Sequence, residues 1–263
     1  MITLDVNQHI ARVKLCRAQK MNALDQGAFT ALVEVASEIE RNPAIRAVLL
    51  LAEGDHFCAG ADKAFLQGAV SENSVFAERA LSLKANEIAN EFQKPCLAFR
   101  ELGVPVIAVL QGVTYGAGLQ LALAADIRIG SPTTSMSLFE INWGLIPDMA
   151  VTQTLPRLVN YDVALELMVT GRVVEADEAV QLGLLTRKEN EPMNVAEQLA
   201  GQIVARSPDA VRSGKKLLRE SVHLSKAQAL ALEAQLQAEL VGSANQIEAA
   251  LANIGKRPPV FTD

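Results

Sequence analysis

The sequence has few aromatic residues, few cysteines and no long apolar run. Phenylalanine, tryptophan and tyrosine together make up 4% of the 263 residues. The three cysteines, Cys16, Cys58 and Cys96, are scattered, and no pair has the spacing of a metal site or a redox motif. We therefore interpret them as buried thiols in a reducing compartment and predict no metal site. No apolar run reaches the roughly 18 residues of a membrane-spanning helix, so no membrane association is expected.

Positive charge is also in the minority. The chain carries 24 lysines and arginines against 30 acidic residues, a net charge of −6. Proteins that bind nucleic acids usually carry a basic stripe or patch, so we predict no nucleic-acid partner. The first residues alternate between polar and apolar like a strand and lack the basic and apolar regions of a signal peptide. These features predict a soluble, cytoplasmic protein with one large domain.

Short apolar runs, glycine-rich turns and helical patterns alternate in the first two thirds of the chain. Residues 47–52 and 104–110 have the composition of strands buried on both faces. Pro105 must lie at the start of the second strand, because proline cannot donate within a central ladder. Residues 22–25 have the composition of a turn and helix cap, and a helical pattern follows at 29–39. A long, partly polar helical stretch is predicted from about residue 63 to residue 100.

This alternation indicates an α/β fold. Strand, glycine turn and helix recur, which favours right-handed βα units and a mainly parallel arrangement. After about residue 190 the pattern becomes helical. Helices are expected to begin at Ser207-Pro208 and at Ser225, since serine is a preferred N-cap and proline is favoured in the first turn.

Two glycine turns, Gly60-Ala61 and Gly116-Ala117-Gly118, each follow a buried strand and precede a helix. At such a junction, free backbone N–H groups and the positive end of the helix dipole are directed at one point. Neither turn matches the phosphate-binding glycine motifs. Two such turns together suit an oxyanion hole, in which two amides bind a polarised carbonyl oxygen. The alternative is that both turns merely join tight strand–helix corners.

Three segments resemble the signature of the crotonase family, also called the enoyl-CoA hydratase/isomerase family. They are residues 54–62, 111–119 and 125–129. The likeness covers nearly the whole chain, and its order and spacing are highly specific. Further matches lie at residues 22–24, 144–147, 170–172, 176–184, 207–208, 215 and 256–259.

The resemblance implies a crotonase-type spiral of ββα turns with a helical C-terminal oligomerisation region. Residues 1–195 are then the α/β core that binds acyl-CoA, and residues 196–263 are the region for trimerisation. We expect a homotrimer or a dimer of trimers. CoA enters as part of the substrate, so no separate cofactor is expected.

The resemblance also implies roles for individual backbone groups. Ala61 and Ala117 correspond to the two amides that hold the thioester oxygen. Ala117 stands where many members have glycine, and an amide donor survives this change if φ at that position need not be positive. The CoA end of the substrate is expected to be bound by the region around Lys20, Ala59, Asp62 and Lys63.

The carboxylates are expected to carry protons once the thioester oxygen is held. Hydratases of the family hold a water between two glutamates; here the first position is Gln120 and the second is Glu140. An amide can hydrogen-bond water or substrate but cannot transfer a proton. Asp148 matches an acid of the family's dienoyl-CoA isomerases. We therefore predict an enzyme that moves protons on an unsaturated acyl chain, with Glu140 and Asp148 as catalytic residues and Gln120 as a substrate-binding residue.

Several alternatives stay open at this stage. The protein could be an enoyl-CoA hydratase with altered water handling, or a non-catalytic acyl-CoA-binding scaffold. Asp148 could be the N-cap of a helix over residues 149–158, and Glu140 could be a surface residue. The three histidines are interpreted as structural or surface residues. Cations that could pair with CoA phosphates, or lie on a solvated helix face, are Lys215, Lys216, Lys256 and Arg257.

Overall fold

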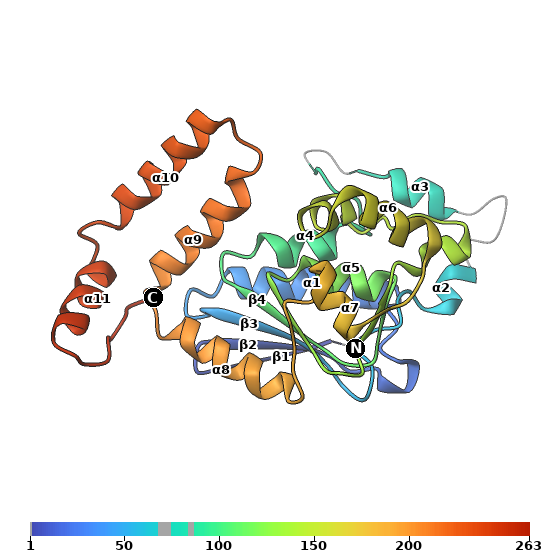
Figure 1. The fold of residues 1–263 in the computed structure, drawn as a ribbon, viewed down its shortest axis with the longest axis horizontal. Helices are drawn as coiled ribbons and strands as arrows, with labels where there is room; N and C mark the ends of the chain where they lie inside the picture. Colours follow the sequence, from blue (N-terminus) through green and yellow to red (C-terminus); the bar gives the residue numbers. More distant parts are fainter. Residues whose placement is uncertain (1, 68–74, 84–86) are drawn as a thin grey trace.

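A computed structural model describes residues 2–67, 75–83 and 87–263, whose strands form two sheets (Figure 1). The larger sheet is parallel except for the antiparallel pair β1–β2. In sheet order it contains β1 (Ile2–Asn7), β2 (Ile10–Leu15), β3 (Ala47–Ala52), β4 (Val106–Leu110), β6 (Ile127–Gly130) and β9 (Arg187–Lys188). The smaller sheet contains β5 (Val113–Tyr115), β7 (Ser135–Ser137) and β8 (Val174–Glu175).

The chain winds repeatedly from the larger sheet to the smaller sheet and then into a helix. Strand β4 is followed by β5 and by helix α5 (Ala117–Ala124). Strand β6 is followed by β7 and, after short 3-10 segments, by helix α6 (Tyr161–Thr170). After β3, Cys58 makes an isolated bridge to Thr114 of the smaller sheet before helix α2 (Lys63–Gln67) begins. The predicted α/β class and the mainly parallel arrangement are confirmed.

Both faces of the larger sheet are covered, which explains why its central strands are wholly apolar. Along β3, Val48 and Leu50 belong to the core that also contains buried residues of α1, α4 and α5. The intervening Leu49 and Leu51 belong to a second core formed with helix α8. Figure 1 shows α8 on the opposite side of the sheet from the other three helices. Their bounds are Gln26–Glu40 for α1, Lys94–Glu101 for α4 and Pro192–Val204 for α8.

The predicted helix starts are confirmed by their caps. The carboxylate of Asp25 accepts a hydrogen bond from the backbone N–H of Ala28 at 2.9 Å, at the start of α1. Ser207 caps α9 (Pro208–Ser221), and Ser225 forms a capping box with Gln228 at the start of α10 (Lys226–Leu240). These interactions are local, so the sequence could predict them.

The long helix predicted over residues 63–100 is wrong. The described residues of this span form three short helices: α2, α3 (Val75–Leu81) and α4. Residues 87–93 form bends and turns, in which the Asn90 side chain accepts hydrogen bonds from the backbone N–H groups of Phe92 and Gln93, both at 3.0 Å. Asparagine competes with helix formation in this way, and Pro95 favours a helix start over continuation. Residues 68–74 and 84–86 lie outside the described residues.

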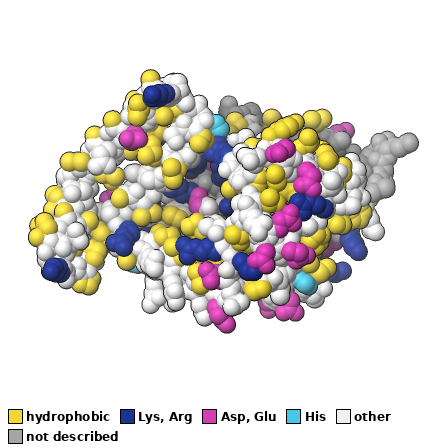
Figure 2. Space-filling model, in the orientation of Figure 1, with side chains coloured by type: hydrophobic (Ala, Val, Ile, Leu, Met, Phe, Trp, Pro, Cys, Tyr) yellow, Lys and Arg dark blue, Asp and Glu magenta, His cyan; other side chains and the backbone are white. Residues whose placement is uncertain are grey.

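The C-terminal helices α9, α10 and α11 (Ala244–Ile254) project from the body as an arm (Figure 1). Hydrophobic side chains are spread along this arm (Figure 2), and Leu218 and Ile254 are strongly exposed. The chain then returns to the body, where Arg46 donates to the Asp263 carboxylate at 2.7 Å. Helix α8 crosses the predicted boundary at residue 195 and packs on the sheet through Ala196 and Ala200.

None of the helices in the described ranges is both long and apolar enough to cross a lipid bilayer.

Candidate active site

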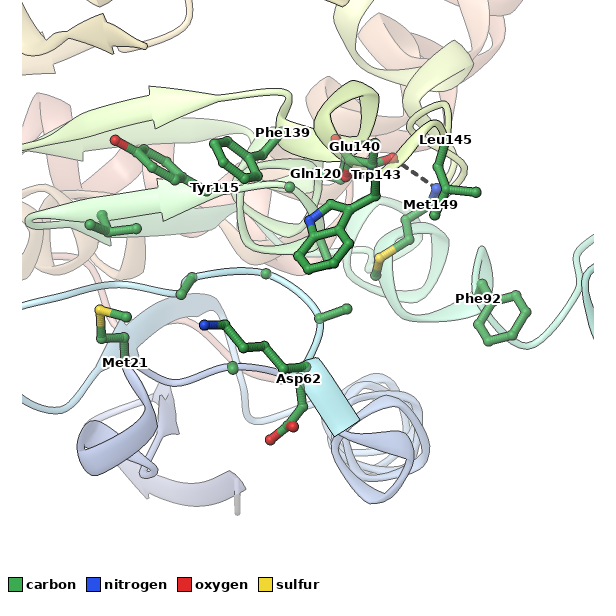
Figure 3. A pocket seen from close by; sticks show the side chains of 18 of the residues that line it. Met21, Asp62, Phe92, Tyr115, Gln120, Phe139, Glu140, Trp143, Leu145 and Met149 are labelled. Atoms are coloured by element: carbon green, nitrogen blue, oxygen red, sulfur yellow. Dashed lines mark hydrogen bonds between the residues drawn. The ribbon is translucent and has the colours of Figure 1, made fainter. Parts of the chain in front are cut away.

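One cavity of about 520 Å³ is lined by all nine residues that were predicted as catalytic, oxyanion-hole or substrate-binding residues (Figure 3). It lies where the two glycine turns, the short segment η2 (Phe139–Trp143) and the residues that follow η2 meet. The predicted residues in its lining are Lys20, Ala59, Ala61, Asp62, Lys63, Ala117, Gln120, Glu140 and Asp148.

The two glycine turns lie against each other, and a Cβ at Gly60 would crowd the backbone of the second turn. Gly60 has φ +103° and Gly116 has φ +52°, both in the region that favours glycine. A Cβ on Gly60 would lie 3.1 Å from the carbonyl oxygen of Tyr115 and 3.6 Å from the backbone nitrogen of Ala117. A Cβ on Gly116 would lie 3.9 Å from the Cα of Gly60. The backbone of each turn therefore forms part of the wall opposite the other.

Cys58 connects the two turns. Its N–H donates to the Val113 carbonyl at 3.0 Å, and its own carbonyl accepts from the Tyr115 N–H at 2.9 Å. A Cβ on Gly118 would lie 2.5 Å from that carbonyl oxygen and 2.6 Å from the Cβ of Cys58. Gly118 therefore lets helix α5 pack directly against the first turn. Cys58 is fully buried, and burial raises the pKa of its thiol to about 12.

The backbone N–H groups of Ala61 and Ala117 donate to no acceptor among the described residues. The groups beside Ala61 are engaged: Leu24 N–H donates to Gly60, and Asp62 N–H donates to Leu24, both at 2.8 Å. Ala117 is the first residue of α5, where an N–H has no partner one turn earlier. Its φ is not positive, so alanine in place of glycine costs no strain.

Glu140 lies beside the second turn. Its Oε1 accepts a hydrogen bond from Gln120 Nε2 at 2.8 Å and would lie 3.2 Å from a Cβ on Gly116. Its Oε2 is buried and has no hydrogen-bond partner among the described residues. Burial raises the pKa of Glu140 to about 7; the Gln120 hydrogen bond opposes this shift, and the charge of Asp148 adds to it. The surface alternative for Glu140 is therefore wrong.

Gln120 is 1% exposed and makes a second hydrogen bond. Its Oε1 accepts from the backbone N–H of Met149 at 2.8 Å. Figure 3 shows the side chains of Gln120, Glu140 and Met149 close together in the lining of the cavity. The glutamine therefore contacts the candidate acid on one side and the residue after Asp148 on the other.

Asp148 is half-buried in the same wall, and burial raises the pKa of its carboxyl. It does not cap a helix, so that alternative is wrong. The next helical segments are 3-10 turns over Val151–Gln153 and Leu155–Arg157, and each begins after a later residue. The left-handed φ of +61° at Ala150 separates Asp148 from the first of them.

The predicted CoA end of the cavity is cationic. Lys20 and Lys63 are exposed in its lining, and neither makes an ion pair within the described part of the chain. Asp62 is engaged in the fold, because its carboxylate accepts from the Ala64 N–H at 2.9 Å and pairs with Arg17 at 2.7 Å. These contacts lower the pKa of Asp62, with the Ala64 hydrogen bond as the largest cause.

Some candidates from the sequence support the fold instead. Lys215 has a side chain that is only 8% exposed, and its Nζ donates to the Val104 carbonyl at 2.8 Å and to the Asp126 carboxylate at 2.7 Å. It is therefore not available to a CoA phosphate. His56 accepts a hydrogen bond from the Val113 N–H through Nδ1 at 3.1 Å, which agrees with its structural interpretation.

The apolar wall of the cavity was largely missed by reasoning from the sequence. Trp143 lies in the wall of the cavity and is 48% exposed. Phe29 and Phe92 also line the cavity and pack edge to face, with ring centroids 6.0 Å apart. Phe29 has the spacing of an ordinary core residue of α1, so no local signal distinguishes it.

The raised pKa of Glu140 predicts that Glu140→Gln stabilises the fold at pH 8 but not at pH 4. The protonated Glu140 side chain makes its full contribution to the free energy of unfolding below a pH of about 4.5. This contribution is lost as the pH rises through about 7, the raised pKa of Glu140 in the folded protein. Glutamine is exempt from this loss, which is on the order of 3 kcal/mol at about 1.4 kcal/mol per pKa unit. Urea unfolding of both proteins at the two pH values measures the difference. Glu233→Gln, an exposed glutamate of α10, is the control. An equal gain at both pH values would contradict the prediction.

Comparisons with known proteins extend over nearly the whole chain. The family described as Enoyl-CoA hydratase/isomerase matches residues 5–263. The short-chain-enoyl-CoA hydratase of Clostridium acetobutylicum is 30% identical over 259 residues, covering 97% of this chain and 95% of that protein. The human mitochondrial enoyl-CoA hydratase domain-containing protein 2 is 34% identical over 264 residues, covering 97% and 86%. The crystal structure of an enoyl-CoA hydratase from Bacillus anthracis has a TM-score of 0.89 at 28% identity, covering 99% and 98%.

Proposed function

Because this chain belongs to the enoyl-CoA hydratase/isomerase family, we propose that it isomerises an unsaturated acyl-CoA by moving a proton along the acyl chain. The protein is an enzyme of this family, and its fold is the crotonase-type spiral of ββα turns. The observation that carries the proposal is the buried, unpartnered Oε2 of Glu140 beside the two glycine turns.

The thioester oxygen is held by the N–H groups of Ala61 and Ala117. Both groups lack acceptors within the described residues, and the turns that carry them lie against each other in the lining of the cavity. Two fixed donors stabilise the negative charge that develops on this oxygen when a neighbouring proton is removed. Lys20 and Lys63 bind phosphate groups of CoA, since a flexible ammonium suits phosphate.

Glu140 carries the proton. In the ionised form it removes a proton from the α-carbon of a 3-enoyl thioester, which leaves a dienolate whose charge rests on the held oxygen. It then returns the same proton to the γ-carbon, and the product is the 2-enoyl thioester. A carboxyl with a pKa of about 7 suits both steps, because neither protonation state is strongly favoured near neutral pH. Asp148 is the second acid when the proton must reach a more distant carbon.

Hydration of a 2-enoyl thioester is the alternative activity, and it is the activity for which the Clostridium acetobutylicum relative is named. Hydration needs a water held by two groups in the site. Here Gln120 already donates to Glu140 and accepts from Met149, which favours isomerisation. The observation against a non-catalytic acyl-CoA scaffold is Oε2 of Glu140, because a buried carboxyl oxygen without a hydrogen-bond partner costs stability and needs a functional reason.

We also propose that residues 196–263 assemble the protein into a homotrimer or a dimer of trimers. The arm of α9 to α11 exposes apolar side chains, including Leu218, Val222 and Ile254. Apolar surface of this kind is usually covered by a partner. Sedimentation equilibrium tests the assembly, and a monomer at micromolar concentration would contradict it.

The proposed activity is tested by offering 3-enoyl, 3,5-dienoyl and 2-enoyl thioesters of CoA in several chain lengths. We expect conversion of at least one of the first two, detected by the absorbance of the conjugated product, and slower hydration of the third. Isothermal titration with the same thioesters measures binding separately. Binding without turnover of any substrate would favour the scaffold, and hydration alone would favour the hydratase.

A further inference from the structure

We propose that Gln120 is a positioning residue that holds the Glu140 carboxylate and the segment of Asp148 in one arrangement, so that Oε2, and not Oε1, is the atom of Glu140 that exchanges protons with substrate. The inference rests on the proposed function of Glu140. It rests on two hydrogen bonds: Gln120 Nε2 to Glu140 Oε1, and Met149 N–H to Gln120 Oε1, both at 2.8 Å.

The orientation of the Gln120 amide follows from the Met149 hydrogen bond. The oxygen and nitrogen of a side-chain amide are usually assigned from their partners. A backbone N–H can only donate, so the atom of Gln120 that faces Met149 must be the oxygen. The nitrogen therefore faces Glu140, and rotation of the amide by half a turn would break both hydrogen bonds. Burial of the side chain makes that loss costly, since water does not replace the partners.

This orientation decides which oxygen of Glu140 carries the proton. An amide nitrogen donates but does not accept, so Oε1 must accept from Gln120 in both protonation states. A proton on Glu140 is therefore placed on Oε2, the atom that is buried without a partner. The hydrogen bond from Gln120 thus leaves one oxygen of Glu140, Oε2, to donate and accept the proton.

The same side chain connects the reacting parts of the site. Gln120 lies three residues after Ala117 on helix α5, so the proposed oxyanion amide and the positioning side chain share one short, fully buried helix. Through Met149, Gln120 also fixes the backbone next to Asp148. A shift of about 1 Å in such an arrangement can cost on the order of 100-fold in rate.

The test is the titration of Glu140 measured by infrared spectroscopy, which needs no turnover. The carboxyl band of Glu140 is assigned by its loss in Glu140→Gln. In Gln120→Met, which keeps an unbranched side chain of similar length, the midpoint of this band is expected to move above about 7, because the hydrogen bond that favours the ionised form is lost. The acidic limb of the kcat profile should move upward with it. We expect kcat to fall on the order of 10- to 100-fold with little change in KM.

Two further variants separate positioning from folding. In Gln120→Glu the new side chain still accepts from Met149, but it donates to Glu140 only when protonated. When it is ionised, its charge lies beside that of Glu140, so the Glu140 midpoint should move above about 7 and the acidic limb of the kcat profile should move upward with it. Asn245→Leu is the matched control, because Asn245 is a buried amide outside the cavity lining that bridges Asp209 and Thr262. It should lower stability and leave the Glu140 midpoint unchanged.

An unchanged Glu140 midpoint in both Gln120 variants would overturn the inference. A midpoint that moves while the kcat profile stays in place would show that Gln120 holds Glu140 but that Glu140 is not the proton carrier, which contradicts the proposed function instead. The infrared titration still decides the Gln120 contact if no acyl-CoA is converted.

Discussion

Glu140→Gln is expected to lower kcat by about 100- to 10,000-fold, the usual contribution of a positioned acid or base. Glutamine can accept the hydrogen bond from Gln120 through its oxygen, so the cavity should keep its shape. It cannot take up or release a proton at neutral pH. Steady-state kinetics on whichever enoyl-CoA is converted gives kcat, and isothermal titration gives the affinity for the substrate.

Affinity for the thioester is expected to stay within a few fold, since the contacts proposed for its oxygen and its phosphates come from backbone groups and lysines and not from Glu140. Glu233→Gln on the exposed side of α10 is the control and should keep full activity. Activity of Glu140→Gln within tenfold of the unchanged protein would rule out Glu140 as the proton carrier. If Asp148→Asn lost more activity than Glu140→Gln, Asp148 would be the primary acid.

Ala117→Pro is expected to lower kcat by about 100- to 1,000-fold, because it removes one of the two proposed oxyanion donors. Proline is favoured at the first residue of a helix, where its missing N–H breaks no hydrogen bond of the helix. Gly116 precedes it in a non-helical conformation without a Cβ, so the usual clash before proline is reduced. The substitution therefore removes the donor while helix α5 is retained.

The matched control is Ala244→Pro, the same change at the first residue of α11, outside the lining of the cavity. Both variants should keep the far-ultraviolet circular dichroism of the unchanged protein. Only Ala117→Pro should lose turnover, measured as kcat on the preferred thioester at saturating concentration. Equal activity of the two variants would show that the Ala117 N–H does not hold the substrate oxygen.

Much of the fold follows from local signals. The wholly apolar run at 47–52 became a strand covered on both faces, and Ser207 and Ser225 begin helices through contacts within three residues. The prediction over residues 63–100 was wrong where one asparagine side chain satisfied two backbone amides and interrupted the helical pattern. The spacing of apolar residues predicts a helix without regard to side chains, such as that of asparagine, that take up backbone N–H groups and so compete with helical hydrogen bonds.

The sequence by itself determined the parts of the site that lie at strand–helix junctions. Ala61 and Ala117 are placed by glycine turns whose conformation is set within a few residues. The tertiary structure alone decided that Gln120 contacts Glu140, 20 residues away, and Met149, 29 residues away. The tertiary structure also places Phe29 and Phe92 in the wall of the cavity and buries Lys215 in an ion pair with Asp126. Such contacts depend on how the ββα turns stack, because residues far apart in sequence meet only when the sheets and helices have packed.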